Sequence, residues 1–193
     1  SVTYHHGDLR AAILTAAAAS IREHGIAALS LRALAKEVGV THAAPRHHFG
    51  DKRGVITALA AAGYADLAAQ LSAVTGGFLE VGVAYVGWAV DHPGSYQVMF
   101  RPDVVDETDA DLQRTLDELR LALVSALVAR GAAGADGDAA NIEGIPPVGI
   151  AAWGIVHGLA TLLLNGALDV AADDHDAVVD LARSTLVHLD VAQ

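Results

Sequence analysis

Three side chains suited to binding an anion or a base edge lie close together near the amino terminus, namely Arg46, His47 and Lys52. Guanidinium and ammonium groups bind phosphate oxygens, and guanidinium also bonds base edges in the major groove. Patterns that would indicate catalysis are absent from the sequence. It has no Gly-rich phosphate loop, no nucleophile elbow, no His pair at i, i+4 on a helix, and no Cys. This group therefore indicates nucleic-acid binding.

The residues that must position this group read as a helix, a tight turn and a short second helix. The first helix has the i, i+3, i+4, i+7 spacing of one buried face: Leu31, Leu34, Ala35 and Val38. Gly39 can adopt the left-handed conformation that ends it, and Thr41 is expected to be the N-cap of the next helix. That helix, about 42–48, has almost no bulky apolar side chain before Phe49. This pattern predicts a helix-turn-helix, whose second helix enters the DNA major groove.

Four small or polar residues begin the predicted recognition helix and are expected to face bases or backbone: Thr41, His42, Ala43 and Ala44. Arg46 and His47 are the strongest candidates for direct DNA contact, and the alternative is a solvated basic patch. Lys52 stands at the start of a further helix capped by Asp51, where ammonium and free N–H groups can bind one phosphate. His5–His6 is either an arm that reaches DNA or a disordered end.

The net charge of −11 hides a division between the two ends of the chain. Residues 1–53 carry seven Lys/Arg and four acids, whereas the remainder carries five Lys/Arg and nineteen acids. A basic head on an acidic body turns the head toward phosphates. The 53% hydrophobic content is enough for a sizeable core, and no leader pattern is recognisable, so a cytoplasmic protein is expected.

Hydrophobic spacing predicts helices along the whole chain and no strand, so the fold class is all-α. Beyond residue 53, which closes the head, the chain is taken as one helical domain, 54–193. The predicted elements are a first helix from Gly7–Asp8 to Gly25, the two helices above, and further helical segments at 51–71, 78–91, 112–127, 147–168 and 174–190, with a short segment of unassigned structure at 94–100 and a loop at 132–143.

The uncharged run 145–168 is long enough to cross a bilayer. Pro146–Pro147 and the acids at its ends, Glu143 and Asp169, are unlike a spanning segment, which is usually flanked by cations. A core helix that is apolar all round is the expected interpretation, with no membrane role.

The first fifty residues resemble the TetR family of bacterial transcription regulators. The resemblance rests on Leu31-x-x-Leu34-Ala35-x-x-Val38-Gly39-Val40-Thr41, His48-Phe49 and Asp51-Lys52. His92-Pro93-Gly94-x-Tyr96-x-x-Met99-Phe100 and Trp153-x-x-x-His157-Gly158 are similar to the subfamily named for a Trp-His-Gly signature. The resemblance implies an all-helical dimer with a DNA-reading head over 1–53 and a ligand-binding and dimerisation domain over 54–193.

The resemblance also implies that Ser30 and Arg32 contact phosphates, with Ser30 serving as an N-cap as well. Two positions depart from the family pattern. Family members usually have Tyr where this chain has Arg46. Arginine keeps a hydrogen-bond donor at this position and adds a positive charge, but the base preference stays open. Many family members have an acid where this chain has Gly54. Without the acid, half of a capping box is missing.

A pocket for an effector is assigned to five side chains, namely Tyr96, Met99, Phe100, Trp153 and His157. Plain core packing is an equal alternative for each aromatic or Met residue. A metal site at His157 is disfavoured, because no second ligand stands at i+3 or i+4. The Asp173-Asp174-His175-Asp176 run is better explained as a capped helix start than as a metal cluster.

Two functional hypotheses follow. The favoured one is a homodimeric, ligand-responsive regulator, in the repressor role, that binds a near-palindromic operator on double-stranded DNA and is released by a small apolar or aromatic effector. It needs no cofactor and is not an enzyme. The alternative is an α-helical small-molecule binding protein or enzyme without a DNA role, motivated by the apolar segment 147–168.

Overall fold

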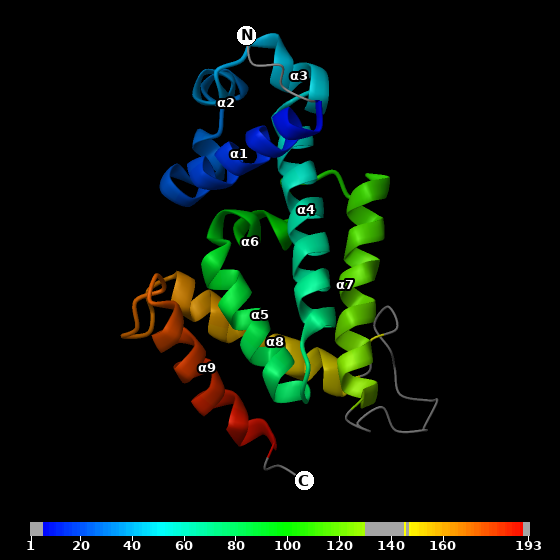
Figure 1. Ribbon diagram of the computed structural model, residues 1–193, viewed down its shortest axis with the longest axis vertical. Coiled ribbons are helices and arrows are strands. Elements are labelled where there is room, and N and C mark those ends of the chain that lie inside the picture. Colours follow the sequence, from blue (N-terminus) through cyan, green and yellow to red (C-terminus); the bar gives the residue numbers. More distant parts are fainter. Residues whose placement is uncertain (1–5, 130–144, 146, 191–193) are drawn as a thin grey trace. The chain divides into compact units, whose positions relative to one another are not determined.

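The protein is all-helical in the computed structural model, which describes residues 6–129, 145 and 147–190 (Figure 1). Within those ranges there is no β-strand, and the predicted fold class is confirmed. The helices are α1 His6–Ala28, α2 Leu31–Val38, α3 Ala43–Phe49, α4 Lys52–Ala73, α5 Phe78–Asp91, α6 Pro93–Met99, α7 Ala110–Ala129, α8 Pro147–Leu164 and α9 His175–Asp190. The predicted loop at 132–143 lies outside the described residues.

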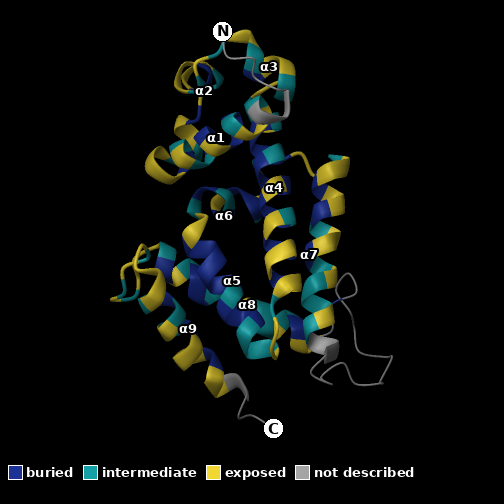
Figure 2. Ribbon diagram, in the orientation of Figure 1, coloured by how far each residue is buried: buried dark blue, intermediate teal, exposed yellow. Residues whose placement is uncertain are grey.

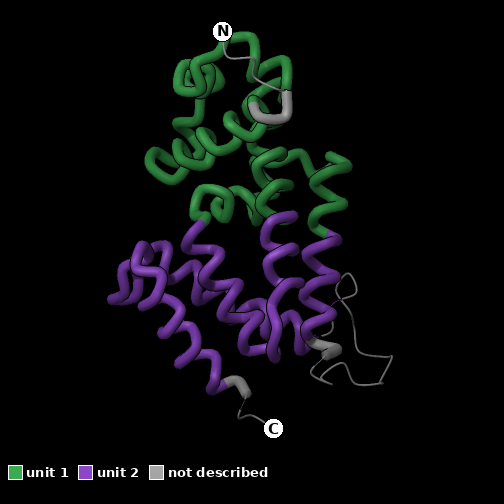
Figure 3. Tube along the Cα trace, in the orientation of Figure 1, with its two compact units in different colours: residues 1–64, 92–116 green, residues 65–91, 117–193 purple. Residues whose placement is uncertain are grey.

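The chain divides into two compact units (Figure 3). Unit 1 contains residues 1–64 and 92–116, and unit 2 contains residues 65–91 and 117–193. Helices α4 and α7 each contribute residues to both units. The units therefore do not follow the sequence boundary placed after residue 53, because α6 and the start of α7 belong with the amino-terminal helices.

In unit 1, α1 presents a buried stripe at helical spacing, with Ile13, Ala17 and Ile21 fully buried. The helix begins at His6, slightly before the expected start at Gly7–Asp8. Gly25 interrupts it with a φ of 78°, a value that favours glycine, and helical residues continue to Ala28. The predicted stop at Gly25 is thus a kink three residues before the helix ends.

Helix α6 approaches α1 at Gly94, where only a residue without Cβ fits. A Cβ at Gly94 would lie 2.1 Å from the carbonyl oxygen of Ala18. Beside this contact, the Tyr64 hydroxyl donates to the carbonyl of Met99. The ring of Phe100 lies 5.7 Å from that of Tyr64 and 5.5 Å from that of Tyr96. These contacts hold α1, α4 and α6 together in unit 1.

The segment between α6 and α7 is tied to the first turns of α4. Arg53 Nε donates to the carbonyl of Val105 at 3.0 Å, and the amide of Asp106 donates to Thr57 Oγ1 at 2.8 Å. Asp109 then caps α7 by accepting from the amide of Leu112 at 2.9 Å. The polar side chains of α4 therefore fix the course of the backbone between two helices.

In unit 2, α5 is buried along most of its length (Figure 2) and packs against α8 and α9. Trp88 donates its indole N–H to Asp66 of α4 at 2.7 Å. On the α9 side, Arg183 pairs bidentately with Glu80, and this hydrogen-bonded partner is the main reason that the pKa of Glu80 is lowered. Helix α5 is thus the central element of the unit.

In the part of the chain that the structure describes, α4 and α8 are long and apolar enough to cross a membrane by length and composition alone. In α4, 61% of the apolar window is buried inside the protein, and in α8 only 33%. Helix α8 ends at Leu164, earlier than the expected Leu168, because Gly166 adopts a left-handed φ of 66° and Ala167 bonds back to the carbonyl of Leu162 at 2.9 Å.

Candidate nucleic-acid interface and ligand cavities

The turn between α2 and α3 is built as the sequence predicts. Leu34 and Ala35 bury one face of α2. Gly39 follows with a left-handed φ of 76°, and its amide bonds to the carbonyls of Ala35 and Lys36. The amide of Val40 also returns to the carbonyl of Ala35, at 2.9 Å. This arrangement ends α2 sharply and sets the direction in which α3 begins.

The expected N-caps of α2 and α3 make no capping bond. Helix α3 begins at Ala43 with His42 in the cap position, so the assignment of Thr41 as N-cap is wrong by one residue. The backbone explains the difference, because the carbonyl of Thr41 accepts from the amide of Ala44 at 3.0 Å in a turn that precedes the helix. Ser30 does occupy the cap position of α2, but its side chain makes no capping bond.

Helix α3 is held by few side chains and displays the rest. Pro45 is buried, and Phe49 is half-buried with the Arg10 guanidinium 5.3 Å from its ring centroid. Of the residues expected to contact DNA, Ala44 is half-buried and the others on this stretch are exposed: Thr41, His42, Ala43, Arg46 and His47. The helix therefore carries Arg46 and His47 on the solvent side.

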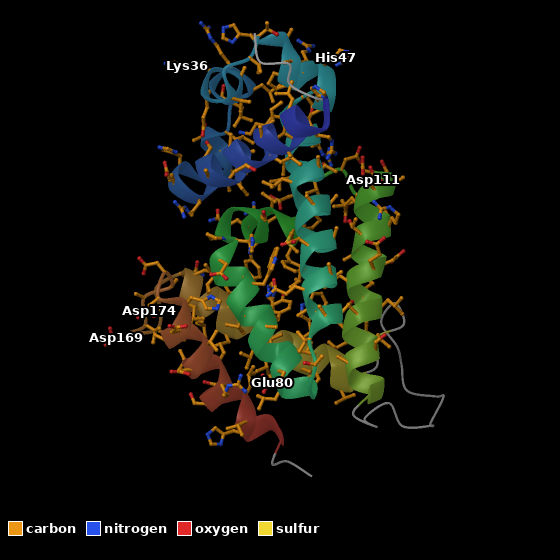
Figure 4. The ribbon with its side chains drawn as sticks, in the orientation of Figure 1. Lys36, His47, Glu80, Asp111, Asp169 and Asp174 are labelled. Carbon is orange, nitrogen blue, oxygen red and sulfur yellow. The ribbon has the colours of Figure 1, made fainter. Side chains whose placement is uncertain are left out.

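Helix α2 adds exposed polar groups to the same unit. Ser30 and Arg32 are exposed at its start, as a phosphate contact requires. Lys36 is exposed as well, and it was not among the residues predicted from the sequence. Figure 4 shows Lys36 and His47 at the end of unit 1 that is uppermost in the view. Lys36 lies on α2 opposite the buried pair Leu34 and Ala35, and this spacing is the signal that could have identified it.

The start of α4 carries the predicted cap and an unpredicted bond. Asp51 accepts from the amide of Gly54 at 2.8 Å, which confirms the capping role. The Lys52 ammonium donates to the carbonyl of Ala27 at 2.9 Å. A Cβ at Gly54 would lie 1.9 Å from the carbonyl oxygen of Phe49. The glycine is therefore required by close backbone approach, and an acid at this position would not fit this turn.

In unit 2, a hydrogen-bonded chain of three side chains joins α5 to α8. Trp153 Nε1 donates to the hydroxyl of Tyr85 at 3.3 Å, and that hydroxyl lies 3.1 Å from His157 Nδ1. Burial lowers the pKa of His157, which favours the neutral ring. Tyr85 is almost fully buried and was missed by sequence reasoning. A tyrosine hydroxyl in the mostly apolar middle of α5 was the available signal.

Among the described residues of unit 2, two of the cavities bear on ligand binding. The larger, of about 600 Å³, lies along the second half of α4 and α7 and is lined mainly by Ala, Leu and Val, with Ser72, Glu118 and Ser125 as polar groups. The smaller, of about 30 Å³, is lined by residues that include Tyr85 and Trp153. Val81 belongs to the wall of both cavities.

The five residues of the predicted effector pocket fall into two groups. Trp153 and His157 belong to unit 2, beside Tyr85. Tyr96 and Met99 are buried in unit 1 with Phe100 against them, in contact with α4. A shared role for the five remains a prediction.

Among the described residues, no group of three or more His, Cys, Asp or Glu side chains could hold a metal ion. Asp174 instead accepts from the amide of Ala177 at 3.1 Å. The acidic run before α9 therefore contains the cap of that helix, as expected. His5 and the side chain of His6 lie outside the described part of the chain.

Two family models cover most of the chain. Residues 13–59 match the model for bacterial regulatory proteins of the tetR family. Residues 78–186, more than half of the chain, match the model described as a tetracyclin repressor-like C-terminal domain. The chain belongs to the TetR family. It is therefore a DNA-binding transcriptional regulator, and its family is one of regulators rather than enzymes. The Trp-His-Gly subfamily remains a prediction.

Solved structures agree with this TetR assignment in fold. A Rhodococcus sp. RHA1 protein of unknown function is 30% identical, with a TM-score of 0.73, over 100% of both chains. A TetR family transcription regulator from Marinobacter aquaeolei VT8 is 14% identical, with a TM-score of 0.61, over 91% of this chain and 94% of its own. The superantigen PfiT also matches, at 18% identity and a TM-score of 0.64, over 96% and 97%. No curated protein matches significantly. Fold similarity alone therefore does not specify activity.

Proposed function

We propose that this TetR-family protein is a cytoplasmic homodimeric repressor that binds a near-palindromic operator and is released by a small apolar or aromatic effector. The observation that carries the DNA role is the exposed face of α3. Arg46 and His47 are solvent-exposed there, whereas Pro45 and Phe49 hold the helix to its unit. Two such helices in a dimer would read successive major-groove faces, roughly 34–36 Å apart or a multiple of that.

The exposed face of α8 supports the homodimer. Its large exposed apolar residues recur every seven positions, at Val148, Ile155 and Leu162, with exposed fractions of 46%, 39% and 47%. Apolar residues that repeat every seven positions lie along one line of a helix, and such lines form the contact between two packed helices. We call this line of α8 the seam. Between them, Gly154 and Gly158 have no atom within 4 Å of a Cβ position, which leaves room for a second backbone. This seam also accounts for the apolar composition of α8 without a membrane.

The effector is assigned to unit 2. The cavity of about 600 Å³ lies within the size range of small-molecule sites, and its mainly apolar lining suits an apolar or aromatic compound. Helix α4 contributes Ala65 and Ser72 to this cavity and Lys52 to the DNA-binding head. We expect the effector to bind more tightly to a form in which α4 is shifted than to the DNA-binding form. It can lower the affinity for DNA by no more than the ratio of its own affinities for these two forms.

Selection of bound sites from random duplexes, followed by gel shift, tests the DNA role. Arg46→Ala should reduce affinity for the selected site at least tenfold, since a charged contact to base or phosphate is lost. Arg22→Ala is the matched control, because Arg22 is an exposed cation on α1 in the same unit. It should change affinity less than threefold. Absence of duplex binding by the wild-type protein at 50 mM salt would refute the proposal.

Lys52 is assigned a phosphate contact. Lys52→Ala should weaken binding equally across operator sequences and reduce the salt slope by about one unit. The bond that Lys52 makes to the carbonyl of Ala27 does not neutralise its charge, so the ammonium can exchange that partner for a phosphate oxygen. A loss that varies with base sequence would contradict this role.

The alternative drawn from the sequence, a small-molecule binding protein or enzyme without a DNA role, is disfavoured by the family assignment. The cavity of about 600 Å³ fits a ligand-responsive regulator equally well. A compound that binds unit 2 should therefore lower the affinity of the protein for the selected duplex.

A further inference from the structure

Unit 1 has a hollow of its own, lined by none of the residues of the two cavities described in unit 2. It is an open depression of about 730 Å³. One wall is the end of α1 at residues 25–27, and another is the start of α4 at residues 52, 53 and 56. The remaining wall comes from Gln97 of α6 and from residues 101, 103 and 104 of the segment that follows.

The rim of this depression is positively charged. Lys52, Arg53 and Arg101 line it together with one acid, Asp103, which leaves a formal net charge of +2 on the lining. This local positive charge contrasts with the net charge of −11 on the whole chain. An electropositive hollow attracts anions.

The cations are held in fixed positions by oxygen partners. Arg53 Nε donates to the carbonyl of Val105 at 3.0 Å, and Lys52 donates to the carbonyl of Ala27 at 2.9 Å. These carbonyls are neutral, so they orient the two charges without cancelling them. Arg101 pairs bidentately with Asp103, at 2.7 and 2.6 Å. Asp106 does not line the hollow; its pKa is lowered mainly by the hydrogen bonds that it accepts from Thr108, and the charge of Arg53 contributes least.

The inner surface of the depression is apolar. Ile56 is buried, and Ile26 and Val104 are half-buried beneath the charged rim. An inorganic ion would leave this surface and most of the volume unused. A small organic anion would place its apolar body on these three side chains and its oxyanion on the rim, where charge-assisted hydrogen bonds are strongest.

We propose that this depression in unit 1 binds a small organic anion through Lys52, Arg53 and Arg101. The site differs from the effector cavity assigned to unit 2 and does not depend on the proposed repressor role. Because Lys52 is also the expected phosphate contact, an anion held here would compete with DNA for the same ammonium group.

Titration of the full-length protein with benzoate, followed by amide NMR, tests the site. Benzamide and acetate at equal ionic strength are the comparison probes, since one lacks the charge and the other lacks the ring. Benzoate should cause saturable shifts at residues 25–27, 53–56 and 101–104, and both comparison probes should bind at least fivefold more weakly. Equal binding of benzamide would overturn the anionic assignment, and equal binding of acetate would overturn the organic one.

Two variants locate the binding. Arg101→Gln and Arg53→Gln should each weaken benzoate at least fivefold, whereas Arg22→Gln, on an exposed part of α1, should leave it unchanged. Arg101 is exposed and its partner is the nearby Asp103, so this variant tests the site even if Arg53→Gln perturbs the segment after α6. Benzoate shifts that survive both substitutions, or that fall on the cavity of unit 2, would overturn the proposal.

Discussion

The hydroxyl of Tyr85 lies 3.1 Å from Nδ1 of His157 and joins α5 to α8. The same hydroxyl accepts from Trp153 Nε1, so its own proton is available to His157. A neutral ring with its proton on Nε2 accepts this proton at Nδ1, whereas a ring with its proton on Nδ1 donates to the hydroxyl instead. One buried oxygen therefore joins Trp153 and His157 beside the smaller cavity.

Tyr85→Phe should lower the free energy of unfolding by about 1–2 kcal/mol, because it leaves the indole N–H and Nδ1 without this partner. Urea unfolding monitored by circular dichroism measures the effect. A double-mutant cycle with Trp153→Phe should give a coupling of at least about 0.5 kcal/mol, as expected for groups in contact. Strict additivity of the two substitutions would contradict the hydrogen-bonded chain.

His157 should make stability depend on pH. Burial lowers its pKa in the folded protein, so the unfolded chain takes up the proton more readily. The resulting stability is present above about pH 6.5 and is lost as pH falls through that value toward the folded pKa. The urea concentration at the unfolding midpoint should therefore decrease as the pH is lowered from 7.5 to 5.5. The decrease should be smaller in His157→Gln. His24→Gln, at an exposed site, should behave as wild type; an equal fall in all three proteins would disprove the assignment.

Gly54→Ala should destabilise the protein by about 1–3 kcal/mol, although alanine favours a helix by about 1 kcal/mol over glycine. The reason is the 1.9 Å approach of a Cβ to the carbonyl oxygen of Phe49. Thermal unfolding compares it with Gly77→Ala, where a Cβ meets no atom within 4 Å and no loss is expected. A more stable Gly54→Ala would show that the turn relaxes easily.

Ile155→Asp should convert the proposed dimer into monomers, because a carboxylate would be buried in an apolar helix seam. Sedimentation velocity gives the mass directly. Leu121→Asp is the control, since Leu121 is 67% exposed on α7, outside the seam. Dimers that persist in Ile155→Asp, or that dissociate equally in the control, would place the interface elsewhere.

Local patterns were sufficient to predict most helices and the helix-turn-helix. The spacing of Leu34 and Ala35, the left-handed Gly39 and the cap at Asp51 depend on neighbours within a few residues, and short-range sterics decide them. The same reasoning placed the N-cap of α3 one residue too early at Thr41, because the choice between a turn and a capped helix start depends on small differences in backbone geometry.

Contacts between distant residues could be decided only by the tertiary structure. The sequence identified Gly54 as a departure from the family and Trp153 and His157 as pocket candidates. It could not show that a carbonyl occupies the space of a Cβ at Gly54, nor that Tyr85, 72 residues from His157, supplies the hydrogen bond. It also could not bring Lys52, Arg53 and Arg101 around one hollow. Side-chain types and their spacing along a helix are local properties, whereas such contacts depend on how helices far apart in the chain pack together.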